Sequence, residues 1–144
     1  MDLPPIDSRK RTILVFSLLF GGCGWGISVF FLIGSWEDST QTLYFMGADV
    51  IEYQPLLNYW LKMAAAAFTF IGLMFFWGAW KPQKFQHMNL LLGWFSLFVG
   101  VVLAVSAVAE GLTPLKHKSF TADIIFCFLV AAGVLGSYCG NKAD

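Results

Sequence analysis

Three charged side chains lie at or near the ends of long apolar runs, and their types suit the binding of a polar head group. Lys62 lies about two turns into one run, Glu110 closes another, and Asp123 opens a third. An ammonium and carboxylates at such boundaries can form a pocket for a lipid head group, a quinone or a cation. The alternative is structural: Lys62 pairs with Glu110, and the neighbouring acidic residues form a solvated loop.

The cysteines and histidines do not form a redox or metal motif. Cys23, Cys127 and Cys139 contain no C-x-x-C pair and occupy different depths of the apolar runs. His87 and His117 fall in connections on opposite sides, and neither has a second histidine three or four residues away. We therefore expect no metal and no cofactor, we identify no catalytic residue, and a non-enzymatic role is favoured.

The elements that position these residues are apolar. Hydrophobic residues make up 58% of the 144 residues and charged residues only 12%, against about 45–50% and about 25% in soluble domains. A soluble protein of this size cannot bury so much apolar surface. The nine basic and nine acidic residues cancel, so no basic field is present to bind nucleic acid. The composition indicates an integral membrane protein in contact with the lipid bilayer.

Charge-free runs lie at 12–36, 63–80, 88–109 and 124–141, and the second is extended back toward Pro55, because proline suits a first helical turn. They predict four membrane-spanning helices, at approximately 12–36, 56–80, 88–110 and 121–141. Each approaches the roughly 20 residues that a helix needs to cross a ~30 Å hydrocarbon core. The short turn 81–87 contains Pro82 and predicts a hairpin between the second and third helices. We expect one all-α domain over 1–144, an integral membrane four-helix antiparallel bundle.

The connections carry further signals. Gly111 and Pro114 should end the third helix, and Ser119 or Thr121 should cap the fourth, with Asp123 in its first turn. The segment 37–54 is long for a turn between helices. Its apolar residues 43–46 and 50–51 are expected to lie on the membrane surface or to cover the mouth of the bundle.

Basic residues are unevenly distributed between the two sides of the predicted helices. One side carries Arg9, Lys10, Arg11, Lys81, Lys84 and Lys142; the other carries Lys62, Lys116 and Lys118. The positive-inside rule then places both termini in the cytoplasm.

The N-terminus permits a second interpretation. Arg9–Arg11, an apolar stretch and Phe20-Gly21-Gly22-Cys23 imitate a lipoprotein signal, whose cleavage would leave Cys23 acylated. The apolar run continues to Trp36, however, whereas the apolar core of a cleaved signal spans about 7–15 residues. An uncleaved first helix is the expectation, and lipidation of Cys23 is left open.

Small residues recur at helical spacing within the predicted spans. The helix-packing candidates are Gly22, Gly26, Gly100, Gly136 and Gly140. Apolar lipid gives helices little hydrophobic reason to associate, so residues that permit close backbone approach become important. We expect contacts among the helices of one chain; the alternative is that one stripe contacts another subunit.

Several motifs in the middle of the chain are familiar. They are Tyr59-Trp60-Leu61-Lys62-Met63-Ala64, Phe68-Thr69-Phe70-Ile71-Gly72, and Lys81-Pro82 with Leu92-Gly93-Trp94. The pattern resembles small four-helix bacterial inner-membrane proteins of uncharacterised activity, and in layout it is similar to DoxX-type proteins. The resemblance implies the topology and no catalytic residue.

Three functions remain after these exclusions. The leading hypothesis is an accessory or assembly subunit that packs against a membrane partner or a second copy of itself. The alternative is a lipid- or quinone-binding protein with an outward-facing pocket at Lys62, Glu110 and Asp123. The third is a small transporter that forms its path on oligomerisation.

Overall fold

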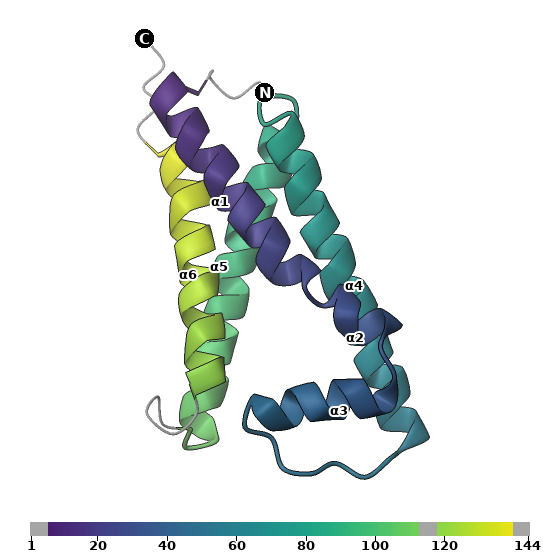
Figure 1. Cartoon of the computed structure of the whole chain (residues 1–144). Coiled ribbons are helices and arrows are strands. Elements are labelled where there is room, and N and C mark those ends of the chain that lie inside the picture. Colours follow the sequence, from purple (N-terminus) through teal and green to yellow (C-terminus); the bar gives the residue numbers. More distant parts are fainter. Residues whose placement is uncertain (1–5, 113–117, 140–144) are drawn as a thin grey trace.

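The computed structural model describes residues 6–112 and 118–139, without the side chains of residues 118 and 119. This part of the chain is helical and contains no strand (Figure 1). The helices are α1 (Ser8–Gly26), α2 (Val29–Ile33), α3 (Trp36–Phe45), α4 (Pro55–Trp80), α5 (Gln86–Ala109) and α6 (Lys118–Tyr138). Four stretches are long and apolar enough to cross a membrane: Ser8–Ile33, Pro55–Trp80, Gln86–Ala109 and Phe120–Tyr138.

The first span differs from the prediction of one continuous helix over 12–36. A turn at residues 27–28 separates α1 from the short α2, and extended backbone at Gly34 ends α2. Ser35 then caps α3, so Trp36 begins a new helix instead of closing the first one. Hydropathy alone does not report this break, because the residues on both sides of it are apolar.

The predicted caps of the last helix are wrong. Since α6 begins at Lys118, Ser119 and Thr121 lie inside the helix, and Asp123 follows the first turn. The end of α5 agrees better with the sequence: Glu110 follows its last residue, and Gly111 has a φ of +65°, a left-handed conformation that favours glycine. Pro114 lies outside the described residues.

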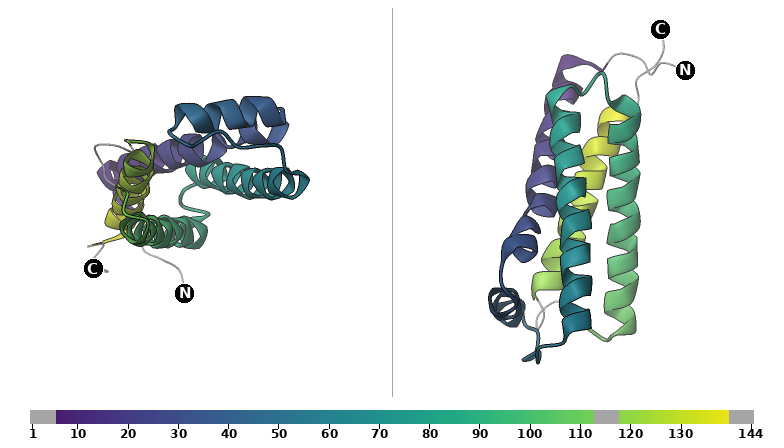
Figure 2. Two further views of the ribbon diagram at one scale, coloured as in Figure 1. Left: turned by 90° about the horizontal axis from the view of Figure 1, so that it is seen from below. Right: turned by 90° about the vertical axis from the view of Figure 1, so that its right-hand side faces the viewer.

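Seen along their length, the long helices form an arc (Figure 2). Helix α5 packs on α6, α6 on α1, and α1 on α4, whereas α4 and α5 have few contacts although a short turn joins them. Consecutive long helices run in opposite directions, and α4 diverges from α5 and α6 toward the end where α3 lies (Figure 1). The arrangement therefore consists of two limbs, α4 with α2 and α5 with α6, which α1 bridges.

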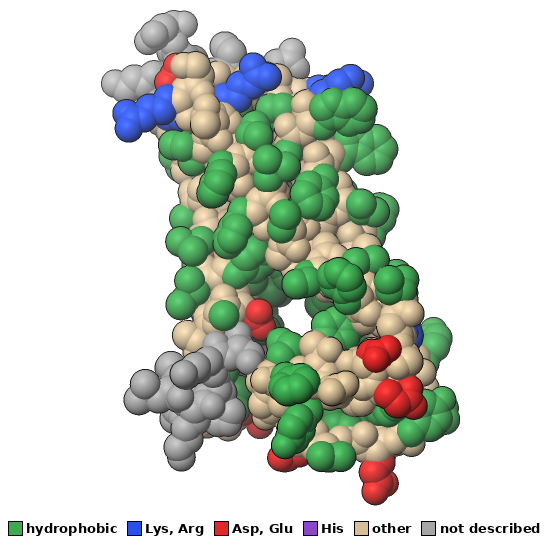
Figure 3. Space-filling view, in the orientation of Figure 1, with side chains coloured by type: hydrophobic (Ala, Val, Ile, Leu, Met, Phe, Trp, Pro, Cys, Tyr) green, Lys and Arg blue, Asp and Glu red, His purple; other side chains and the backbone are tan. Residues whose placement is uncertain are grey.

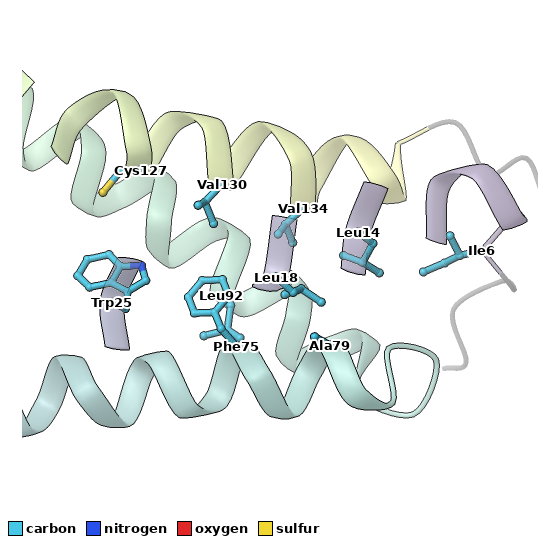
Figure 4. Packing of buried hydrophobic residues seen from close by; sticks show 10 residues of the cluster. All are labelled: Ile6, Leu14, Leu18, Trp25, Phe75, Ala79, Leu92, Cys127, Val130 and Val134. Atoms are coloured by element: carbon cyan, nitrogen blue, oxygen red, sulfur yellow. The ribbon is translucent and has the colours of Figure 1, made fainter. Parts of the chain in front are cut away.

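The hydrophobic core lies between α1, α4, α5 and α6 and extends to the end of the molecule that carries the termini, where Ile6 belongs to it (Figure 4). Leu14 and Leu18 of α1 meet Phe75 of α4 and Val130 and Val134 of α6, and all five side chains are fully buried. At this end Lys10 Nζ also donates a hydrogen bond to the Cys139 carbonyl oxygen (2.7 Å), which links α1 to the end of α6. Inside a bilayer, close van der Waals packing of this kind is the main source of helix association.

Glycines permit the closest helix contacts. A Cβ on Gly72 of α4 would lie 2.6 Å from the Gly26 nitrogen and 3.0 Å from the Gly22 oxygen of α1, so the backbones of α1 and α4 touch there. A Cβ on Gly100 of α5 would lie 3.1 Å from the Cys127 Cβ of α6. The pair Gly22 and Gly26 thus faces a helix of the same chain, and its stripe is not free for another subunit.

The expectation for Gly136 is not met. A Cβ on Gly136 would have no atom within 4 Å among the described residues, so this glycine packs against no other helix there. The contact between α1 and α6 is made instead at Gly133, where an added Cβ would collide with the Ser17 side chain. Gly140 lies outside the described residues.

Candidate functional site

A cavity of about 350 Å³ occupies the space between the two limbs, inside the arc of helices. Each helix contributes to its lining, which includes Leu43 of α3 and Met46, the residue that follows α3. Figure 3 shows a hollow above α3 with a carboxylate at its edge. The expectation that apolar residues 43–46 cover the mouth of the bundle thus agrees with this position, whereas Val50 and Ile51 border a separate surface depression.

Aromatic rings form the inner part of the cavity. Trp25 lies near the end of α1 and is only 8% exposed. Its ring centroid is 5.3 Å from that of Phe68, 5.4 Å from that of Phe95 and 6.1 Å from that of Phe126. Trp25, Phe68 and Phe126 line the cavity, so a molecule held there contacts ring surfaces from α1, α4 and α6.

Lys62 does not pair with Glu110 as the structural alternative required. Its Nζ donates hydrogen bonds to the carbonyl oxygens of Phe31 (3.0 Å), Leu32 (3.0 Å) and Gly34. Carbonyls at a helix C-terminus lack partners within the helix and carry partial negative charge. An ammonium has three N–H donors, so this one lysine satisfies the end of α2 and fixes it to α4.

The start of α3 is held by a capping box. The Ser35 Oγ accepts a hydrogen bond from the Asp38 N–H (3.1 Å), and the Asp38 Oδ2 accepts from the Ser35 Oγ (2.8 Å) and the Ser35 N–H (3.2 Å). These bonds, the one from the Ser35 side chain above all, hold the pKa of the Asp38 carboxyl below its usual value. Lys62 and Ser35 together therefore set where α3 lies across the cavity.

The two acidic candidates lie together. Glu110 and Asp123 both line a smaller cavity of about 130 Å³ between the ends of α5 and α6, and Asp123 also lines the larger cavity. Within the described residues, no hydrogen bond or ion pair of either carboxylate is present. The structure thus brings Glu110 and Asp123 together and places Lys62 in a different role, as a helix cap.

Sequence reasoning missed the aromatic residues that line the cavity. Trp25 lies in the middle of an apolar run, away from the ends of membrane spans, where tryptophan is common. That position, followed by Gly26 and Ser28, was the available signal for a break and a cavity. No cluster of metal-ligating side chains occurs among the described residues, and the cysteines described, Cys23, Cys127 and Cys139, are unpaired with one another.

Comparisons of the chain with protein-family models, with curated proteins and with solved structures find no match. The resemblance to small four-helix inner-membrane proteins therefore remains an expectation from the motifs at residues 59–72 and 81–94.

Proposed function

We propose that this chain is an integral membrane protein of a bacterial inner membrane, an antiparallel four-helix bundle with both termini in the cytoplasm. The four apolar helices support membrane insertion. Lys and Arg side chains gather at the end of the molecule that carries the termini, and acidic ones at the end near α3 (Figure 3). That asymmetry supports the orientation, since basic residues favour the cytoplasmic side.

We propose further that the protein binds a lipid-like molecule in the large cavity, which opens toward the outer leaflet in this orientation. The observation that carries the proposal is a cavity of about 350 Å³ with an aromatic and aliphatic lining and a single carboxylate, Asp123, among its lining side chains. Ligand pockets have this character: mostly apolar walls with a few polar groups. Its volume accommodates part of an acyl or isoprenoid chain.

The accessory-subunit hypothesis is kept as a second candidate. Gly136 supports it, because this glycine of α6 has open space where a helix of a partner would fit. The oligomeric transporter is favoured by no particular contact.

Native mass spectrometry of the protein released from its own membrane in mild detergent tests the proposal. Wild-type protein should keep one molecule of lipid-like mass at activation energies that remove loosely attached lipids. Ala64 of α4 lines the cavity, so Ala64→Phe should fill it and abolish retention.

The matched control is Ala67→Phe, because Ala67 is exposed on the same helix and is not part of the lining. Thermal unfolding of both variants checks that they fold. Equal retention by wild type and both variants would contradict the cavity as the binding site. A stoichiometric complex with a protein partner, with no bound small molecule, would favour the accessory subunit instead.

A further inference from the structure

Asp123 is the one ionisable carboxylate among the described residues that line the large cavity, and its charge restricts which ligand can bind beside it. It lies near the start of the span Phe120–Tyr138, its side chain is exposed, and it lines the cavity. An ionisable group inside a membrane span is costly unless it faces a cavity and has a partner. Among the described residues, no group donates a hydrogen bond to this carboxylate or pairs with it, and its place in the lining leaves it accessible to a ligand in the cavity.

Lys62 does not supply a partner for Asp123. Of the Lys and Arg side chains that the structure describes, Lys62 is the one at the α3 end of the molecule, and its ammonium is occupied by the carbonyls of Phe31, Leu32 and Gly34. Glu110 lines the adjoining small cavity together with Asp123 and adds a second negative charge beside it. These two carboxylates favour a cation over an anion at this edge of the cavity.

The aromatic lining favours the same kind of group. An ammonium over the face of an aromatic ring is attracted by the ring quadrupole. Phe126 follows Asp123 by three residues on α6, so both side chains lie on one helical face and line the cavity beside Trp25. Carboxylate and rings together are the groups by which proteins recognise alkylammonium ions.

Other amphiphiles fit less well. A quinone offers carbonyl acceptors, and an ionised carboxylate has no proton to donate to them. A phosphatidylglycerol head group is anionic and offers no cation to Asp123.

We infer that the cavity binds an amphiphile whose polar end is an ammonium group, with the Asp123 carboxylate as its ionic partner and the aromatic rings around its apolar portion. The inference rests on the proposed function, since it names the ligand class of the same cavity. Two sources share this chemistry: the ethanolamine head group of a phospholipid, and a free alkylamine.

The test uses full-length protein in nanodiscs made from equal parts of phosphatidylethanolamine and phosphatidylglycerol, followed by native mass spectrometry. Wild-type protein should retain phosphatidylethanolamine preferentially. Asp123→Asn should reduce that preference roughly tenfold, the effect of losing one charge-assisted hydrogen bond, and Asp123→Glu should preserve most of it. Asp49→Asn is the matched control, because Asp49 is exposed and lines neither cavity.

A second arm separates the two sources. Dodecylamine and dodecanol, which share one apolar chain, are titrated into protein in phosphatidylglycerol nanodiscs. If wild type prefers dodecylamine to dodecanol, Asp123→Asn removes that preference, and the first arm shows no preference for phosphatidylethanolamine, then the ligand is a free amine. This result supports the inference.

The inference and the proposed function fail in different ways. Suppose that wild type retains a lipid and Ala64→Phe loses it. If that lipid then shows no head-group preference, or a preference that Asp123→Asn leaves unchanged, the ammonium inference alone is overturned. No retained lipid and no bound amine would overturn both.

Discussion

Lys62 shows how one residue can determine the shape of a site without being part of its lining. Its ammonium bonds to the carbonyls at the end of α2, and α3 begins immediately afterwards at Trp36. The side chain is partly buried, so its hydrogen bonds are shielded from competing water. Hydrogen bonds to a charged group contribute about 1.5–3 kcal/mol each, so this lysine is a strong attachment of α2 to α4.

Replacing Lys62 with methionine should therefore loosen α2 and α3 while leaving the core intact. The Lys62→Met side chain keeps its apolar stem but leaves three carbonyls without donors. We expect amide hydrogen exchange over residues 29–45 to rise at least tenfold and the unfolding free energy to fall by about 2–3 kcal/mol. Lys84→Met is the control, because Lys84 is exposed at the opposite end near Phe85. Unchanged exchange in α2 and α3 would show that the lysine does not hold them.

At the level of elements, the crossing of α1 and α4 decides how wide the cavity opens. The two helices touch through backbone at Gly72, Gly22 and Gly26, and beyond this point α1 gives way to α2. No side chain separates the helices there. The core side chains Leu18 and Phe75 lie on the other side of the crossing, toward the termini. The crossing thus holds α1 and α4 together at one end of the molecule, while the two limbs separate at the other.

Gly72→Ala should destabilise the protein more than Gly136→Ala. The added methyl on Gly72 meets the Gly26 nitrogen at 2.6 Å and the Gly26 Cα at 2.7 Å, and backbone atoms cannot rotate away as a side chain can. We expect a loss of about 1–3 kcal/mol, the usual cost of overpacking. Gly136→Ala adds a methyl to open space, so it should be neutral or slightly stabilising. Thermal unfolding in detergent measures both, and equal effects would contradict the close crossing.

For the whole molecule, the relevant feature is the separation of charge between its ends. Arg9, Lys10 and Arg11 begin α1, and Lys81 and Lys84 occupy the turn between α4 and α5. Of the Lys and Arg side chains that the structure describes, all but Lys62 therefore collect at one end. The acidic residues of α3 and of the α5–α6 ends lie at the other (Figure 3). This asymmetry carries the proposed orientation, and with it the outward direction of the cavity.

Cysteine labelling in intact cells tests that orientation. In a background with Cys23, Cys127 and Cys139 replaced by alanine, Asp49→Cys should react with a membrane-impermeant maleimide added outside. Lys84→Cys should react only after the membrane is permeabilised, because the positive-inside rule places its turn in the cytoplasm. Both variants in lysed cells provide the control for reactivity. The reverse pattern would invert the topology and turn the cavity toward the cytoplasm.

Some features of this protein follow from its sequence alone. The number of long apolar helices and their approximate positions follow from hydropathy, which is a sum over neighbouring residues and needs no knowledge of the fold. The end of α5 at Gly111 follows from local backbone preference. The position of charged residues near the ends of apolar runs is likewise local, so Glu110 and Asp123 could be identified as neighbours across one short connection.

Other features were decided only by the tertiary structure. The rotation of each helix and the place where it crosses its neighbours decide such contacts. They decide whether Lys62 meets Glu110 or the end of α2, and whether Gly133 or Gly136 faces α1. A change of one helical position turns a residue by about 100°, so spacing that is visible in the sequence does not select the contact. The cavity exists because α4 diverges from α5, and that divergence arises from packing between distant segments of the chain.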